Sequence, residues 1–311
     1  MTPRLFKQVD VFTSTPYLGN PLAVVLDGSG LDDEAMQRFA RWTNLSETTF
    51  LLLPADASAD YRVRIFTPGG ELPFAGHPTL GSCHAWLQAG GQPKSGDFIV
   101  QECQVGLVKV RREGTRLAFA APPLRRSAPS PMLLPRVAAA LGLKAPQILA
   151  AQQLDNGPVW LGLLLDSPET VLQLTPNHLA LEQLNLKVGV AAVYSPEETS
   201  PLIGRANREA RAFGARVTHV EEGVSAAPDL EVRAFAAPVG INEDPVTGSL
   251  NASLAQWLMA DGHMPERYLA SQGLCLGRAG QVHLERDAQG QVWIGGDSVI
   301  CIDGQVMLGS G

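Results

Sequence analysis

The segment RIFTPGGELPFAGHPTLGS, from Arg64 to Ser82, decides the fold because part of it occurs twice in the chain. Its last six residues begin the stretch HPTLGSCHAWL (77–87), which returns as DPVTGSLNASL (244–254) with Pro, Gly, Ser, Ala and Leu kept in place. Five identical residues in eleven are more than unrelated segments share. We therefore interpret the chain as two copies of one unit.

Each copy of this motif indicates the start of a helix. Proline suits the first helical position because its missing N–H needs no partner there and its φ is already helical. Pro78 and Pro245 therefore predict two helices, with His77 and Asp244 at their N-caps. The free N–H groups and the positive dipole end at such a start can hold a carboxylate. Alternatively, Asp244 only caps its helix and His77 is an ordinary interior histidine.

The rest of the chain repeats in the same order. The matched pairs are GNPLAVVL (19–26) with NGPVWLGLLL (156–165), LDDEAMQRFARWTNL (31–45) with TPNHLALEQLNL (175–186), SETTFLLLP (46–54) with VGVAAVYSP (188–196), and VRIF (63–66) with VRAF (232–235). A chain of 311 residues is also long for a single core. We predict a first domain over 1–122, completed by C-terminal strands within 292–311, and a second over 123–291.

The repeat also shows what is not repeated. Aligning Asn44 with Asn185 puts Val188 where Glu47 stands in the first copy. Because a valine can fill this place, the scaffold does not require a carboxylate, and Glu47 becomes a candidate functional residue. The alternative is a solvated loop carboxylate. A pocket between two like halves is a common place for a ligand.

Composition narrows the function classes. Apolar residues make up 45% and charged residues 18%, as in a globular protein. With a net charge of −7 and no block of like charge, neither nucleic acid nor a membrane is an expected partner. The N-terminus has no signal-peptide pattern, and no window has the roughly 18 apolar residues of a membrane helix. We therefore expect a soluble cytoplasmic protein.

The cysteine spacing and the missing cofactor motifs narrow the expected chemistry further. The four cysteines are scattered, without the paired spacing of zinc or redox sites, and are expected to be free and buried. The motifs GxGxxG, GxxxxGK[ST], HExxH and GxSxG are absent from their required contexts. The sequence therefore predicts a protein that uses neither a nucleotide nor a metal.

Local signals place several further elements. Asp32 predicts the N-cap of a helix that ends near Asn44, and a strand is predicted over Thr48 to Leu53. Asp303-Gly304 predicts a two-residue hairpin turn. The second copy carries extra chain over 200–229, whose spacing and charge predict a surface helix.

Motifs along nearly the whole chain resemble those of one family. They are GNPLAVV (19–25), NLSETTF (44–50), ELPFAGHPTLG (71–81), GINEDPVTGS (240–249), and QG, LGRAG and IGG between 272 and 296. Together they resemble the PhzF-like phenazine-biosynthesis isomerases, which have the diaminopimelate epimerase fold. The resemblance implies an α+β homodimer. Each subunit would have two pseudosymmetric domains, each a barrel-like β-sheet around a central α-helix, with the active site between them.

The resemblance also implies residue roles. Glu47 corresponds to the family's acid/base, which moves a proton between carbons of a cyclic dienyl substrate. The substrate-binding positions are implied to be Gly76, His77, Asp244, Gly248 and Ser249. Related racemases carry two cysteines at the helix starts, whereas this chain reads Ala-Gly-His and Glu-Asp-Pro there. It departs from the family in the extra segment before Val232 and in Ala279, where Pro is common.

The chemistry follows from the properties of a carboxylate. A base that removes a proton from carbon near neutral pH needs a raised pKa, which burial gives to a glutamate. The same acid can return the proton to another carbon without a cofactor. We expect a cofactor-independent isomerase of a small, unsaturated cyclic carboxylate. Two alternatives stay open: a two-base amino-acid racemase or epimerase using Glu47 and Asp244, and a non-catalytic small-molecule binding protein of the same fold.

Overall fold

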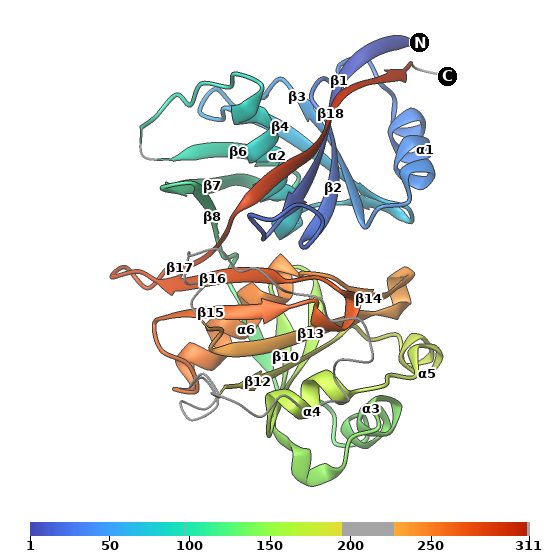
Figure 1. The fold of residues 1–311 in the computed structure, drawn as a ribbon, viewed down its shortest axis with the longest axis vertical. Coiled ribbons are helices and arrows are strands. Elements are labelled where there is room, and N and C mark those ends of the chain that lie inside the picture. The colour runs from blue at the N-terminus through green and yellow to red at the C-terminus, as the bar shows by residue number, and fades with distance from the viewer. Residues whose placement is uncertain (97, 195–226, 310–311) are drawn as a thin grey trace, which may run out of the picture.

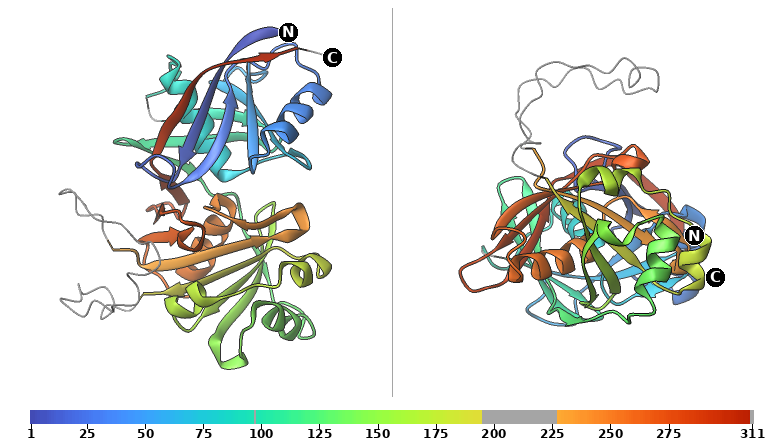
Figure 2. Two further views of the ribbon diagram at one scale, coloured as in Figure 1. Left: turned by 45° about the vertical axis from the view of Figure 1, so that its right-hand side comes forward. Right: turned by 90° about the horizontal axis from the view of Figure 1, so that it is seen from below.

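The structure is a computed structural model that describes residues 1–96, 98–194 and 227–309. The chain forms two stacked lobes, seen in Figures 1 and 2, with the chain ends close together on the upper lobe. Among the described residues, eighteen strands form one continuously hydrogen-bonded sheet. A surface helix was predicted within 200–229. Residues 200–226 of that range lie outside the described residues.

The upper lobe is built mainly from the first half of the chain (Figure 1). Its elements are β1 (Thr2–Val11), β2 (Asn20–Val25), α1 (Asp33–Thr43), β3 (Glu47–Leu52), β4 (Tyr61–Thr67), β5 (Gly70–Leu72), α2 (Gly76–Gln88), β6 (Ile99–Cys103), β7 (Gly106–Glu113) and β8 (Arg116–Ala120). Helix α1 begins as predicted, because the Asp32 side chain accepts a hydrogen bond from Ala35 N at 2.7 Å. It buries one apolar face, whereas α2 is buried along most of its length.

The lower lobe follows (Figure 1). Its elements are β9 (Arg125–Ser127), α3 (Leu134–Leu141), η1 (Ala145–Gln147), β10 (Ile148–Asp155), β11 (Val159–Leu165), α4 (Pro168–Gln173), α5 (His178–Gln183), β12 (Val188–Val193), β13 (Leu230–Ala236), η2 (Ala237–Val239), β14 (Ile241–Asp244), α6 (Gly248–Ala260), β15 (Arg267–Gln272), η3 (Leu274–Leu276), β16 (Gly280–Arg286) and β17 (Val292–Gly296). Its buried central helix is α6, the counterpart of α2. Strand β17 pairs with β8 and joins the two lobes.

The last strand, β18 (Ser298–Leu308), returns to the upper lobe and pairs antiparallel with β1 along its whole length (Figure 1). The hairpin predicted at Asp303-Gly304 was wrong. Asp303 instead pairs with Lys7, whose Nζ lies 2.7 Å from the carboxylate, so tertiary pairing overrides the local turn signal. The two predicted domain boundaries stay predictions.

Strand registers confirm the alignment that singled out Glu47. In the first copy β2 and β3 are parallel and Leu22 pairs with Glu47, while in the second β11 and β12 are parallel and Leu161 pairs with Val188. The preceding turns also match, because Asn44 and Asn185 both adopt the left-handed conformation, with φ of 54° and 53°. Glu47 and Val188 therefore occupy equivalent places.

The helix starts differ from the prediction. Helix α2 begins at Gly76 with Ala75 at its N-cap, so His77 lies inside the first turn. Helix α6 begins at Gly248 with Thr247 at its N-cap, and Asp244 ends β14 instead of capping a helix. The N-cap assignments of His77 and Asp244 were therefore wrong.

A different repeat explains these starts. Both helices follow a Glu-x-Pro-x-x-Gly segment, Glu71 to Gly76 and Glu243 to Gly248. Each glutamate forms a two-bonded ion pair with an arginine of the preceding strand, Glu71 with Arg64 and Glu243 with Arg233. These matched pairs hold both turns in one geometry. The structural counterpart of His77 is consequently Ser249, and that of Asp244 is Leu72.

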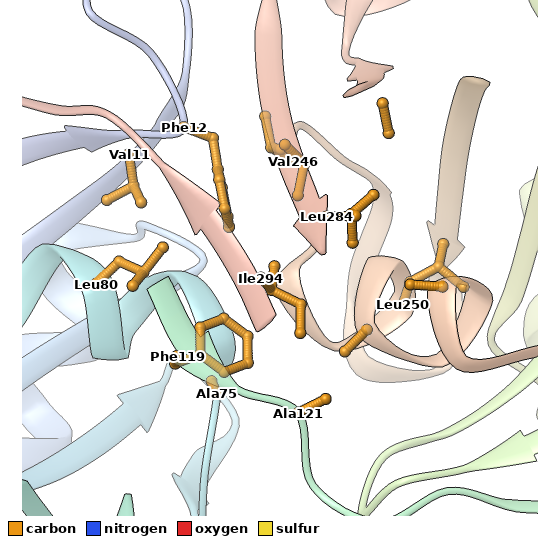
Figure 3. Close-up of a cluster of buried hydrophobic side chains, with 14 of the residues drawn as sticks. Val11, Phe12, Ala75, Leu80, Phe119, Ala121, Val246, Leu250, Leu284 and Ile294 are labelled. Atoms are coloured by element: carbon orange, nitrogen blue, oxygen red, sulfur yellow. The ribbon is translucent and has the colours of Figure 1, made fainter. Parts of the chain in front are cut away.

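The two central helices meet at their first residues. A Cβ on Gly248 would lie 2.9 Å from the Gly76 Cα, and one on Gly76 would lie 3.0 Å from the Gly248 Cα. Apolar packing continues around this contact. Figure 3 shows Leu80 and Phe119 in one cluster with Leu250 and Ile294, so a single core spans both lobes.

The cysteines and the helix lengths bear on two further predictions. The four cysteines are free within the described part of the chain, and Cys83 and Cys103 are buried as predicted. Cys275 is exposed and Cys301 is half-buried, which corrects the prediction for these two residues. None of the helices that the structure describes has the length and apolarity to cross a membrane.

The glycine contact predicts the effect of adding one methyl group. Gly248→Ala should lower the free energy of unfolding by about 1–3 kcal/mol, because the new Cβ would overlap the backbone at Gly76. Chemical denaturation measures the change. Gly304→Ala, where a Cβ has open space, is the matched control. Equal losses in both variants would show that the contact tolerates a methyl group.

Candidate active site

A cavity of about 330 Å³ lies between the two halves of the chain. The first half contributes Glu47, Thr67, Leu72, Pro73, Phe74, Ala75, Val105 and Pro122, and the second Asn156, Gly157, Pro158, Trp160, Lys187, Ala236, Val239, Ile241, Asp244, Thr247 and Ser249. Most of this lining is apolar, with a few polar groups, as in small-molecule sites. Its volume suits a ligand with a single ring.

Glu47 reaches the cavity from the first position of β3. Its side chain is 13% exposed, and Oε2 is buried without a hydrogen-bond partner among the described residues. Burial, followed by the negative charge of Asp244, raises the pKa of Glu47 well above its ordinary value. The carboxyl group therefore holds a proton at a pH where an exposed glutamate would have lost it.

His77 lies behind Glu47 and does not line the cavity. Its Nε2 is 3.4 Å from Glu47 Oε2, and burial lowers the His77 pKa to about 3, so the ring is neutral. The Asn20 amide nitrogen lies 3.4 Å from Nδ1. Nε2 of this neutral ring therefore faces the Glu47 carboxyl group, and Nδ1 faces the Asn20 amide.

Asp244 is held on both carboxylate oxygens. Asn20 Nδ2 donates to Oδ1 at 2.9 Å, and Thr247 Oγ1 donates to Oδ2 at 2.6 Å. Burial raises the Asp244 pKa to about 6, although these two hydrogen bonds act to lower it. Gln272 fixes the same turn, because its Nε2 donates to the Asp244 carbonyl at 3.0 Å and its Oε1 accepts from Thr247 N at 3.0 Å.

The helix starts contribute unequally to the cavity wall. Gly76 and Gly248 contact each other and lie outside the lining. Ser249 lines the cavity, and its Oγ accepts from Trp160 Nε1 at 3.2 Å. The structure thus brings the predicted site residues into one region, while their contacts with a substrate stay predictions.

Sequence reasoning missed several residues of this site. Asn20 links the two halves, because its Nδ2 also donates to the Val246 carbonyl at 2.9 Å. Trp160 and Lys187 come from the second half and line the cavity. Asn20 had a signal, as a polar residue inside the GNPLAVV motif, and Gln272 stood in the QG motif. Trp160 and Lys187 had none beyond their place in the repeat.

Over the residues that the structure describes, no group of three or more His, Cys, Asp or Glu side chains could hold a metal ion.

Comparisons with known proteins agree over nearly the full length. The family model PhzC-PhzF, described as phenazine biosynthesis-like protein, matches residues 9–304. The Schizosaccharomyces pombe protein "Antisense-enhancing sequence 1" is 33% identical, covering 99% of this chain and 100% of its own. The Pseudomonas aeruginosa trans-2,3-dihydro-3-hydroxyanthranilate isomerase is 30% identical, covering 96% and 98%.

Solved structures show the same fold. A PhzF-family protein from Bacillus anthracis matches with a TM-score of 0.77 at 21% identity, covering 99% of this chain and 100% of its own. The predicted diaminopimelate-epimerase-like fold is confirmed.

The buried state of Glu47 predicts a pH-dependent gain in stability on its replacement. Between the ordinary glutamate pKa and the raised pKa in the folded protein, folded Glu47 keeps a proton that the unfolded chain has lost. The stability of the wild-type protein therefore falls as the pH rises through this window. Glu47→Gln should have the higher Tm at pH 8, with a smaller difference at pH 4, by calorimetry.

The control for this measurement is Glu182→Gln, which replaces an exposed glutamate in α5. It should show no such trend. A difference between Glu47→Gln and wild type that is constant from pH 4 to pH 8 would contradict the buried, protonated carboxyl group.

Proposed function

The chain belongs to the PhzC-PhzF family and is an isomerase, and we propose that it transfers a proton between two carbons of a small, unsaturated cyclic carboxylate, with Glu47 as the acid/base. One observation supports this most directly. Glu47 lines an apolar cavity and has a buried oxygen without a hydrogen-bond partner among the described residues. Burial raises the pKa of this carboxyl group, and its side chain forms part of the cavity wall.

The proposed reaction needs no other reactant. The ionised Glu47 takes a proton from one carbon, so that a C–H bond breaks, an O–H bond forms and the electron pair shifts into the conjugated system. The protonated Glu47 then donates the proton to a second carbon, and the double bond moves. Apolar walls exclude water that would exchange with this proton.

Neighbouring groups tune Glu47 for both steps. The negative charge of Asp244 makes Glu47 a stronger base by raising its pKa. The neutral ring of His77 places Nε2 3.4 Å from Oε2 and orients the carboxylate. His77 thus acts through Glu47 as a positioning residue.

The cavity and the relatives support the proposed substrate class. One relative is named for trans-2,3-dihydro-3-hydroxyanthranilate, an unsaturated ring acid. The cavity has the size and the apolar walls for such a ring. The N-terminus of α6, with Ser249, can receive the carboxylate, since helix starts favour anions. A second copy of the chain, in a homodimer, is also part of this proposal.

The two-base racemase is less well supported. Asp244 accepts a hydrogen bond on each carboxylate oxygen, and both bonds act to lower its pKa and so weaken it as a base. Glu47 Oε2 accepts no hydrogen bond from the described residues. A single acid/base therefore fits the site better than a pair on opposite faces of one carbon.

Removing the acid/base should stop the reaction but not binding. With trans-2,3-dihydro-3-hydroxyanthranilate as the trial substrate, Glu47→Gln should lower kcat by on the order of 10³-fold, because an amide cannot carry the proton. Substrate affinity, measured by calorimetry, should change little. Glu182→Gln is again the control. A Glu47→Gln enzyme with normal kcat would refute the mechanism, and wild type that binds this acid and returns it unchanged would favour a binding protein.

Removing the charge of Asp244 should change the pH dependence. The rate needs ionised Glu47, so kcat/KM of the wild type should fall as the pH drops through the raised Glu47 pKa. Asp244→Asn removes one cause of that increase and should move the acid limb to lower pH. The pH profile of kcat/KM measures this, and an unmoved acid limb would exclude Asp244 as a cause.

A further inference from the structure

The charges around the cavity are unbalanced for an acidic ligand. Three lining residues have acidic or basic side chains, namely Glu47, Asp244 and Lys187. Lys187 is the only cationic side chain among them. An anionic substrate would otherwise meet two carboxyl groups and no countercharge apart from the helix N-terminus.

Lys187 is firmly placed at this wall. It directly precedes β12, and its carbonyl accepts a hydrogen bond from Leu161 N of β11 at 2.8 Å. The register of β11 and β12 makes its neighbour, Val188, the counterpart of Glu47. Equivalent edges of the two copies thus supply an acid from one half and a cation from the other.

The ammonium group of Lys187 lies against the Trp160 ring, and no carboxylate among the described residues pairs with it. Its Nζ lies 5.2 Å from the centre of the Trp160 ring, and it forms no ion pair with any residue that the structure describes. Burial lowers the pKa of Lys187. A partly buried, unpaired cation is costly, and an incoming anion would remove that cost.

Trp160 connects this cation to the helix start. Its Nε1 donates to Ser249 Oγ at 3.2 Å, which fixes the indole, while the face of its ring contacts Lys187. Both residues line the cavity. The indole therefore holds Lys187 and Ser249 on one wall.

We propose that Lys187 forms an ion pair with the carboxylate of the substrate, beside the indole of Trp160, and thereby restricts this site to ring acids. This inference rests on the proposed function, because it concerns the same cavity and substrate class. It adds a specificity-determining residue that takes no part in proton transfer.

Two probes of similar shape, one charged and one neutral, test the ion pair. Anthranilate is a ring acid, and anthranilamide is its uncharged counterpart. Calorimetric titration should show wild type preferring the acid by about 10- to 100-fold, the range of a charge-assisted hydrogen bond. In Lys187→Met this preference should fall below about 3-fold, and Lys187→Arg should retain most of it. Lys187→Gln replaces the methionine variant if that one unfolds.

Different outcomes separate the two proposals. A preference unchanged in Lys187→Met, or absent in wild type, would overturn the role of Lys187. Glu47→Gln should keep the full preference, because Glu47 acts on the proton. If the carboxylate preference depends on Lys187 but wild type isomerises no ring acid, the proposed function fails and this inference stands. With an active substrate, Lys187→Met should raise KM at least 10-fold and alter kcat less.

Discussion

The site depends on one backbone contact, where two helices meet at their first residues. Gly76 and Gly248 approach so closely that neither can carry a side chain without a shift of its neighbour. The contact brings two positive helix ends together, which is favourable only with negative charge nearby. Glu47 and Asp244 lie in this region, and a bound carboxylate would add to them. The geometry of the scaffold and its preference for an acid thus have a common origin.

Desolvation explains why this region suits proton transfer from carbon. The same burial raises the pKa of Glu47 and lowers that of His77, so an acid and a neutral imidazole lie side by side. Asn20 joins them to Asp244 across the two halves. Each group is ordinary by itself, and its position in the apolar cleft gives it an unusual protonation state.

The repeated sequence predicted two like units and the place of Glu47, because strand patterns and the turns at Asn44 and Asn185 are local properties. The family motifs predicted the fold of each unit. The helix starts were not predictable from prolines alone, since the Arg–Glu pairs that hold those turns join separate strands. Lys187 was missed for a similar reason. Its significance comes from Trp160 and the cavity wall, which only the folded chain brings together.

The return of β18 to β1 has a consequence for how the protein is made. During synthesis on the ribosome, the upper lobe lacks its closing strand until the lower lobe has emerged. Until then β1 presents an open edge on one side, which is a template for aggregation. The upper lobe therefore cannot be completed before the lower lobe has been synthesised, and a chain stopped before Ser298 would expose that edge permanently.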